Sequence, residues 1–330
     1  MTKMLHELTK VEQIASSFHI IFLLMFSIIG ICGNSLTIIA VIRVHKLSTP
    51  TNFFIANLAV ADLIVCLFVN PFYVLTIIHQ EWPLGNAICK YIGFATAWTC
   101  GASLMNLAAI AINRYICIVQ SKHYTDIFSK KNTILFCCLT WLLALLSVLP
   151  PLLGFGSYGL NINLMSCNIS SSRESWKYMA TILTIYFGCT AVIIFICYYK
   201  IFKLLKTSSV KIQTQPTSDR RMSTHGRRSL LRPSDIKIAK NLLLVSLVFA
   251  ICWAPIMILS IADVKGNTSK TLWRAVGVLA LANSMINPII YAWKNRGFKQ
   301  AYLQTIKCNC ANFQASISEN SRPCESGHSK

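Results

Sequence analysis

The sequence predicts an all-α membrane protein, a bundle of seven transmembrane helices followed by a short amphipathic eighth helix. Of the 330 residues, 54% are hydrophobic and only 13% are charged, a composition typical of membrane proteins. Seven apolar segments follow one another, each with about 20 residues or more, enough to cross a bilayer as a helix. The segments are 18–42, 53–78, 87–119, 133–153, 176–205, 236–262 and 272–293.

The basic residues predict how this bundle is oriented. Of the 31 lysines and arginines, 23 lie in segments that are cytoplasmic if the amino terminus is outside, as the positive-inside rule requires. The net charge of +20 then reflects topology and contact with anionic lipid, and nucleic acid is not an expected partner. The first apolar run is too long for a signal-peptide core. We expect a multi-pass plasma-membrane protein with residues 1–17 outside, 18–306 as the membrane domain and 307–330 as a disordered cytoplasmic tail.

The third segment places a cysteine and an arginine at opposite membrane faces. From Cys89 to Arg114 a helix rises about 37 Å, slightly more than the hydrocarbon thickness of roughly 30 Å. Most of the 14 cysteines lie inside spans, where they pack as small apolar residues. Cys89 and Cys167 lie at the oxidising face, so a disulfide between them is expected.

Two polar residues stand out inside the first two segments. Asn34 must find a hydrogen-bond partner, and we interpret it as a packing contact with a neighbouring helix. Asp62 lies deep in the second span, where a carboxylate is costly and indicates a functional site. Pro71 should kink the same helix.

Two sequons fall on the outer face, beginning at Asn168 and Asn267. Sequons are common by chance, yet both agree with the charge rule and are candidate glycosylation sites.

The sixth and seventh segments both contain proline, two residues after Trp253 and directly after Asn287. Proline kinks a helix and makes a natural pivot.

Beyond the seventh segment, an amphipathic pattern predicts a helix on the inner leaflet, with Phe298, Ala301, Tyr302 and Ile306 on one face. Cys308 and Cys310 follow it, and they are either palmitoylated or idle tail cysteines.

The third inner loop, 207–233, is polar and basic and is expected to be mobile. Ser223 and Ser229 follow paired arginines and so resemble sites of basic-directed kinases. A solvated basic loop on anionic lipid explains the pattern equally well. Phosphorylation would neutralise the local positive field.

Together the motifs resemble the rhodopsin-like (class A) G-protein-coupled receptors, over about residues 18–310. Within that family, the runs 111–115 and 249–255 look most like those of melatonin receptors. The motifs are Gly33-Asn34, Leu58-Ala59-Val60-Ala61-Asp62, Cys89, Asn113-Arg114-Tyr115, Trp141, Cys252-Trp253-Ala254-Pro255 and Asn287-Pro288-Ile289-Ile290-Tyr291.

The resemblance implies roles for three sets of residues. The G-protein switch would be formed by Asn113, Arg114, Tyr115, Tyr198, Asp235 and Tyr291, with Asp235 holding Arg114 in the inactive state. An allosteric sodium ion would be enclosed by Asp62, Ser103, Asn283, Ser284 and Asn287. The ligand pocket would be lined by Thr96, Ala97, Cys100, Ile169, Tyr186, Trp253, Met257, Gly277 and Leu281.

The sequence also departs from the family pattern. Asn113 replaces the usual acid before the switch arginine, which removes a restraint on Arg114. Thr190 replaces the fifth-helix proline, so the local bulge there is in doubt. Thr96 occupies the position where amine receptors carry an aspartate, which argues against a monoamine ligand. Leu281 occupies the position of the retinal-binding lysine of opsins, which argues against covalently bound retinal.

The residues that contact melatonin in its receptors are also replaced in this sequence, by Pro151, Ser171 and Ile169. The expected pocket lacks charged side chains and should prefer a small neutral ligand, although a peptide seated on the outer loops is the alternative. The expected partners are this ligand, a heterotrimeric G protein, arrestin, receptor kinases and membrane lipid.

Other functional classes are weaker interpretations. A channel or transporter would be expected to carry several charged residues inside the membrane, or an inverted repeat of its spans. Here Asp62 is essentially the one intramembrane charge, and no inverted repeat is seen. An enzyme is disfavoured by the lack of a His-Glu-x-x-His or Gly-x-Ser-x-Gly motif.

Overall fold

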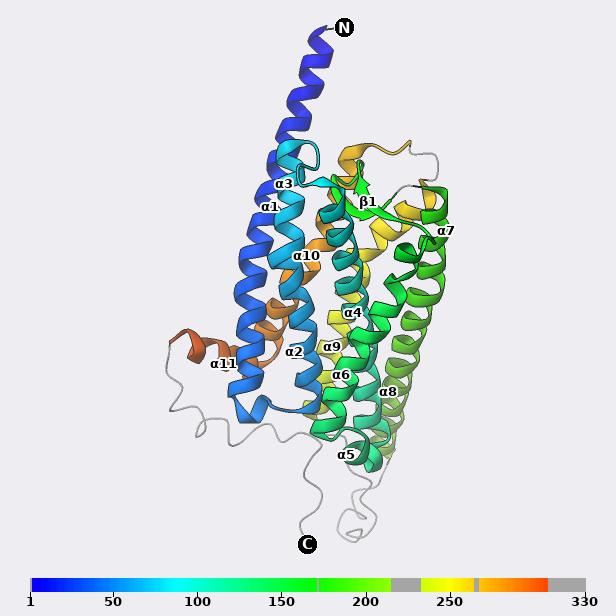
Figure 1. The fold of residues 1–330 in the computed structure, drawn as a ribbon. Helices are drawn as coiled ribbons and strands as arrows, with labels where there is room; N and C mark the ends of the chain where they lie inside the picture. Colours follow the sequence, from blue (N-terminus) through cyan, green and yellow to red (C-terminus); the bar gives the residue numbers. More distant parts are fainter. Residues whose placement is uncertain (1, 171, 215–232, 264–266, 308–330) are drawn as a thin grey trace.

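The computed structural model describes residues 2–170, 172–214, 233–263 and 267–307. Within these ranges the chain forms seven helical spans that are long and apolar enough to cross a membrane, which confirms the predicted fold class (Figure 1). The spans are α1 (Thr2–Arg43), the continuous α2 (Pro50–Ile64), η2 (Val65–Val69) and α3 (Asn70–His79), then α4 (Gly85–Val119), α6 (Lys130–Val148) with η4 (Pro150–Leu153), the continuous α7 (Arg173–Thr181), η5 (Ile182–Phe187) and α8 (Gly188–Thr214), α9 (Pro233–Ala262) and α10 (Lys270–Lys294).

Helix α1 begins well before the predicted first span. It starts at Thr2 rather than near Phe18, and Figure 1 shows it extending beyond the bundle at the end where the chain begins. No glycine or proline occurs before Gly30, so nothing in the sequence interrupts the helix.

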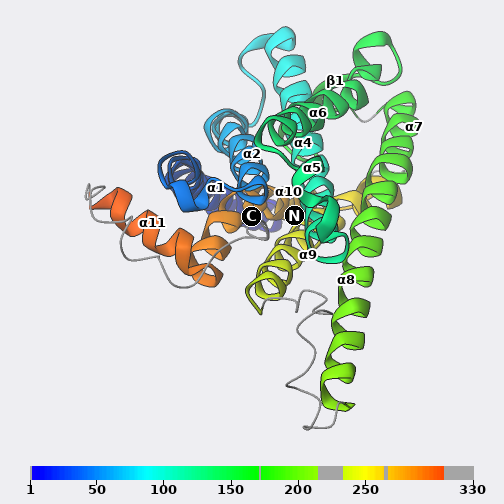
Figure 2. The same cartoon turned by 90° about the horizontal axis from the view of Figure 1, so that it is seen from below.

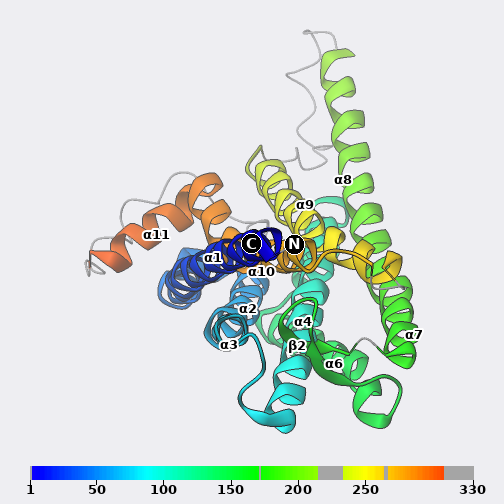
Figure 3. The same cartoon turned by 90° about the horizontal axis from the view of Figure 1, so that it is seen from above.

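Helix α4 forms the centre of the bundle. It packs against α2, α6, α8 and α9, and the view from above shows these elements around it (Figure 3). Phe54 of α2 and Leu107 and Ile110 of α4 are completely or almost completely buried, so their burial anchors the inner half of the core.

Helices α1 and α10 approach closely because position 33 is a glycine. A Cβ there would lie 2.6 Å from Cγ of Pro288. One residue on, the Asn34 amide Nδ2 donates to the carbonyl oxygen of Ser284 at 2.8 Å. The predicted packing hydrogen bond is therefore confirmed.

A second polar network joins α2, α4 and α6. Asn57 donates to Asn106 Oδ1 at 2.8 Å and accepts from the Trp141 indole nitrogen at 2.9 Å. The Trp98 indole nitrogen donates to the carbonyl oxygen of Trp141 at 3.0 Å. These bonds satisfy polar side chains that the bilayer could not.

Two spans contain a π-helical turn. The turn η2 ends two residues before Pro71, which lacks the N–H needed to continue the α-helical ladder. The turn η5 forms in the fifth span although no proline follows it, so the local bulge is present after all. Thr190 Oγ1 donates to the carbonyl oxygen of Tyr186 at 2.7 Å and supplies a hydrogen bond beside this bulge.

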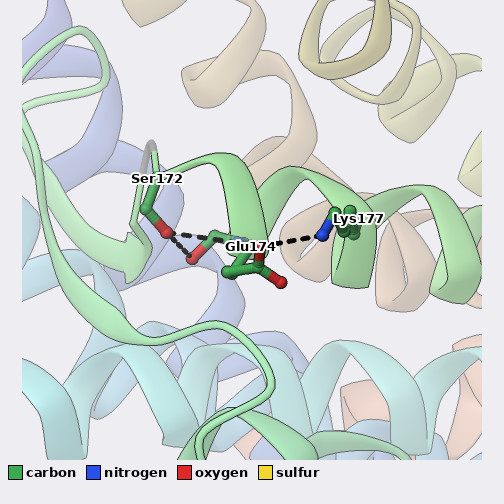
Figure 4. A network of polar contacts seen from close by, with 4 residues as sticks. Ser172, Glu174 and Lys177 are labelled. Atoms are coloured by element: carbon green, nitrogen blue, oxygen red, sulfur yellow. Dashed lines mark hydrogen bonds and ion pairs between the residues drawn. The ribbon is translucent and has the colours of Figure 1, made fainter.

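The outer face carries a β-hairpin of two antiparallel strands, β1 (Tyr158–Asn161) and β2 (Ser166–Ile169), which Figure 3 shows over α4. After it, Ser172 caps the start of α7, and its Oγ accepts from the Ser175 backbone N–H at 3.2 Å. A surface ion pair of 2.8 Å joins Lys177 to Glu174 in the same turn (Figure 4).

The inner face carries short elements and the amphipathic helix. η1 (His45–Leu47), η3 (Ser121–His123) and α5 (Tyr124–Ile127) form inner loops, and α11 (Arg296–Ile306) lies across the bundle end (Figure 2). Phe298, Ala301 and Tyr302 are buried as predicted, and the Tyr302 hydroxyl bonds Thr37 Oγ1 at 2.5 Å. Ile306, the last residue of α11, is 65% exposed, and its predicted contact is with lipid of the inner leaflet.

Candidate functional site: an outer cavity, a buried acid and an inner arginine

A cavity of about 40 Å³ lies between the outer halves of α3, α4, α9 and α10, beneath the hairpin. Four predicted pocket residues line it, namely Thr96, Trp253, Gly277 and Leu281. Five others, Ala97, Cys100, Ile169, Tyr186 and Met257, are not in its lining. The complete lining is Val69, Phe72, Tyr73, Trp82, Ile92, Thr96, Leu164, Ser166, Cys167, Asn168, Trp253, Ile256, Gly277, Ala280 and Leu281.

The lid of this cavity is held by the predicted disulfide. Cys89 at the outer end of α4 is bonded to Cys167 of β2, with Cα atoms 5.1 Å apart, which confirms the expected pair. Leu164 and residues 166–168 cover the cavity, whereas Ile169 was expected to do so. The chain enters β2 through a turn in which Asn161 Oδ1 accepts from the backbone N–H of Leu164 at 3.1 Å.

Three aromatic residues in the lining, Phe72, Tyr73 and Trp82, were missed by the sequence reasoning. The first two follow the α3 proline, Pro71, and Trp82 precedes the disulfide cysteine. Their clustering near these two features is the signal that could have indicated them.

The cavity lining is neutral. It contains no acidic or basic side chain, and the buried indole nitrogen of Trp253 has no hydrogen-bond partner among the described residues. The lining therefore favours an uncharged ligand and offers it a hydrogen-bond donor from below.

A second, smaller cavity of about 10 Å³ lies deeper in the bundle. Thr96, Trp253 and Leu281 line both cavities, so the Trp253 side chain separates an outer from an inner space. The Trp253 ring stacks on Phe249 with centroids 5.9 Å apart, and Phe249 stacks on Phe187 of η5. These stacked rings link the wall of the outer cavity to the fifth and sixth spans.

The inner cavity is built around Asp62, which is 1% exposed. Asn287 Nδ2 donates to Asp62 Oδ2 at 2.8 Å, and Ser103, Asn283 and Ser284 also line the space. The side-chain oxygens of Asn283 and Asn287 are buried and lack partners in the described part of the chain. A carboxylate with several oxygen atoms fits a hard monovalent cation such as sodium.

The predicted switch arginine lies at the inner end of α4. Arg114 is 5% exposed, and its Nη2 and Nε donate to the side-chain oxygen of Asn113 at 3.0 and 3.3 Å. Asn113 Oδ1 also accepts from Thr51 Oγ1 at 2.7 Å. Asn113 therefore restrains Arg114 through a neutral acceptor, contrary to the expectation that the restraint is lost.

The structure does not place the expected latch. Among the described residues Arg114 forms no ion pair with Asp235, which is itself buried. The reason is geometric, because Arg114 turns back to the adjacent Asn113 instead of reaching across to α9.

The remaining switch residues surround the same inner end. Tyr198 and Tyr291 are buried, and Tyr198 lies within electrostatic range of both Arg114 and Tyr291. The Tyr115 hydroxyl accepts from Gln120 at 3.4 Å, and Lys200 lies 5.4 Å from its ring centroid.

The candidate modification sites differ in their surroundings. Asn168 lies in β2 and lines the outer cavity, whereas Asn267 is exposed in the third outer loop. Nearby, hydrogen bonding from the Trp273 indole holds the pKa of Asp263 below its usual range. Ser223, Ser229, Cys308 and Cys310 lie outside the described residues, as does Ser171.

Comparisons with known proteins agree with this geometry. Residues 33–291 match the model of the 7 transmembrane receptor (rhodopsin family). The chain is 30% identical over 288 residues to melatonin receptor type 1B-B of Danio rerio, covering 86% of this chain and 79% of that receptor. It is 30% identical over 296 residues to melatonin receptor type 1A of Mus musculus, covering 88% and 80%. The crystal structure of squid rhodopsin shares the fold, with a TM-score of 0.78 and 23% identity over 96% of this chain and 93% of that one.

Proposed function

The chain belongs to the rhodopsin family of seven-transmembrane, G-protein-coupled receptors, and we propose that it senses a small neutral extracellular molecule in the outer cavity. The observation that carries this proposal is the uncharged lining closed over by β2. The lid also disfavours a peptide, which would need an open outer surface.

Melatonin itself is not implied by the relatives. Pro151 stands where a melatonin contact is expected, and it is buried in η4 rather than in the cavity lining. The ligand is therefore proposed as a neutral class and not as that compound.

The test is a screen of neutral amphipathic molecules, melatonin included, that measures ligand-dependent nucleotide exchange on a panel of G proteins. Each active compound is then tested on Gly277→Leu, because even a Cβ added at this position would lie 3.1 Å from Leu164 Cδ2 and from the Tyr73 hydroxyl. The larger side chain should fill the cavity and lower potency at least tenfold. Gly159→Ala in β1 is the matched control, since its Cβ would approach only Ser170 Cβ, at 4.0 Å. Equal potency on both variants would contradict the assignment.

The proposed route of activation runs from the outer cavity to the G-protein face. A ligand seated on Trp253 would change the stacking with Phe249, and that change would reach the inner ends of α8 and α9. Arg114 would then exchange its bonds with Asn113 for contacts with the G protein. This route requires the outer cavity and the amino terminus to be extracellular, the orientation that the distribution of basic residues favours.

We further propose that a sodium ion held by Asp62, Ser103, Asn283, Ser284 and Asn287 favours the inactive state. An ion that binds one state better than the other shifts the equilibrium by that differential affinity. The support is that Ser103, Asn283 and Ser284 line the same cavity as Asp62, and that the side-chain oxygens of Asn283 and Asn287 are buried without partners among the described residues.

Regulation on the inner side is proposed from the sequence. Arrestin and receptor kinases would act there, Ser223 and Ser229 would be phosphorylated to dampen coupling, and Cys308 and Cys310 would carry lipid beside α11. Mass spectrometry of stimulated cells, with a Ser223→Ala, Ser229→Ala double mutant, tests the phosphorylation. Unmodified serines or unchanged desensitisation would leave a basic loop that only contacts lipid.

A further inference from the structure

A polar cluster lies between the outer ends of α1, α3 and α10, and of its members only Tyr73 also lines the outer cavity. It consists of Ser16 and His19 of α1, Tyr73 of α3 and Arg274 of α10. Arg274 is 8% exposed, Tyr73 4%, and Ser16 and His19 9% each. All four side chains are therefore more than nine-tenths buried.

The cluster converges on the arginine. Arg274 Nη1 donates to Ser16 Oγ at 3.4 Å, and the guanidinium charge acts on both His19 and Tyr73. The Tyr73 hydroxyl lies against α10 one turn further along, where a Cβ on Gly277 would be 3.1 Å from it. Tyr73 also lines the outer cavity, so the cluster borders that space.

Three polar atoms of the cluster are left without a hydrogen-bond partner in the described ranges. They are Arg274 Nε, His19 Nδ1 and the Tyr73 hydroxyl. Nor does Arg274 form an ion pair with any described acid. A guanidinium keeps its charge at all relevant pH values, and a buried charge without a counter-charge is strongly unfavourable. A negative partner is therefore missing from the described contacts.

We propose that this cluster is a binding site for a small anion with a single negative charge. The Arg274 guanidinium supplies the counter-charge, and the Tyr73 hydroxyl and the His19 imidazole can donate hydrogen bonds to the anion. The same chemistry has two sources, a free ion such as chloride or the carboxylate of a molecule in the adjoining cavity. The site goes beyond the proposed function, which assigns no role to α1.

One competing occupant is part of this chain. Glu12 lies one helical turn before Ser16 in α1, and its side chain is outside those described. The experiment must therefore separate an external anion from this carboxylate.

The test uses the full-length receptor, purified in a neutral detergent without ligand. Its thermal unfolding is followed while chloride replaces the larger isethionate at constant sodium concentration and ionic strength, and formate is tested in the same way. An anion that binds only the folded state stabilises it by mass action. We expect the melting temperature to rise by about 2–4 °C at saturation.

The variants assign the effect to the cluster. Arg274→Gln should abolish the anion response, and Tyr73→Phe, which changes one hydroxyl, should raise the anion concentration at half-effect several-fold. Arg296→Gln removes an exposed arginine of α11 and should respond as the wild type does. If Arg274→Gln does not fold, Tyr73→Phe carries the comparison alone.

Each outcome decides the proposal. A response to chloride and formate supports a free anion, and a response to formate alone supports a ligand carboxylate. No response in the folded wild type would overturn the site. A response in both Arg274→Gln and Tyr73→Phe that equals the wild-type response would also overturn it. An anion response that appears only in Glu12→Gln would also overturn it, because the chain's own carboxylate would then be the occupant. Ligand-free unfolding is the readout, so failure here leaves the neutral-ligand proposal standing.

Discussion

Replacing Asn113 by aspartate should lower the ligand-free activity of the receptor. In the wild type, two nitrogen atoms of the Arg114 guanidinium donate to one neutral amide oxygen, at 3.0 and 3.3 Å. Both side chains are buried, Asn113 completely. A carboxylate in place of this amide would keep the acceptor and add a negative charge, so the hold on Arg114 would become charge-assisted.

The size of the effect follows from hydrogen-bond energies. A bond to a charged group contributes about 1.5–3 kcal/mol net, and a neutral bond about 0.5–1.5 kcal/mol. Since both donors share one oxygen, we count a single difference of about 1–1.5 kcal/mol. That difference corresponds to a change of roughly tenfold in the population with Arg114 released.

The assay is nucleotide exchange on a G protein in membranes without ligand, normalised to the number of receptors at the surface. Asn113→Asp should reduce basal exchange about tenfold. Asn113→Ala removes the acceptor and should raise it. Thr51→Val removes only the donor to Asn113 and should change basal exchange by a smaller factor. Basal exchange that is equal or higher in Asn113→Asp would refute the role given to this contact.

Three further predictions concern the outer face and the buried acid. Cys89→Ser and Cys167→Ser should each sharply reduce surface expression or ligand binding, because the lid loses its attachment to α4; normal behaviour of both would contradict this. Asp62→Asn should abolish the inhibition of agonist affinity by sodium, measured in competition binding with sodium exchanged for a large organic cation; surviving sodium sensitivity would show that the ion binds elsewhere. Asn267→Gln should remove a glycan and increase gel mobility, whereas Asn168→Gln should leave mobility unchanged because Asn168 is engaged in β2 and the cavity wall. A mobility shift in Asn168→Gln alone would reverse this ranking.

Features that depend on membrane physics could be predicted from the sequence. Long apolar runs had to become spans, and the buried Asn34 and Asp62 each had to find a polar partner on another helix. They found the carbonyl oxygen of Ser284 and the amide of Asn287. The disulfide followed from the topology, since Cys89 and Cys167 were the outer cysteines.

Features that depend on helix rotation and on single hydrogen bonds could not be predicted in this way. A span is apolar on its lipid face and on its cavity face, so periodicity did not show that Phe72 and Tyr73 turn inward. The direction of Arg114 depends on a local contact with Asn113 that no pattern in the sequence encodes. The bulge in the fifth span forms beside the hydroxyl of Thr190 rather than at a proline.

The polar atoms left without partners indicate where the bundle can change state. Apart from the cluster at Arg274, they lie along the interior of the spans, and among the described residues they include Trp253 Nε1, Asn283 Oδ1, Asn287 Oδ1 and the Tyr291 hydroxyl. The bilayer core offers these atoms no hydrogen bonds, so a ligand, an ion or water must supply them. The proposed ligand above Trp253 and the proposed ion beside Asp62 would therefore act on adjoining parts of one polar path that leads toward Arg114. Because the two cavities share Trp253 in their walls, the proposed ligand and the proposed sodium ion would each change the shape of the other's site, and this shared wall would couple the two.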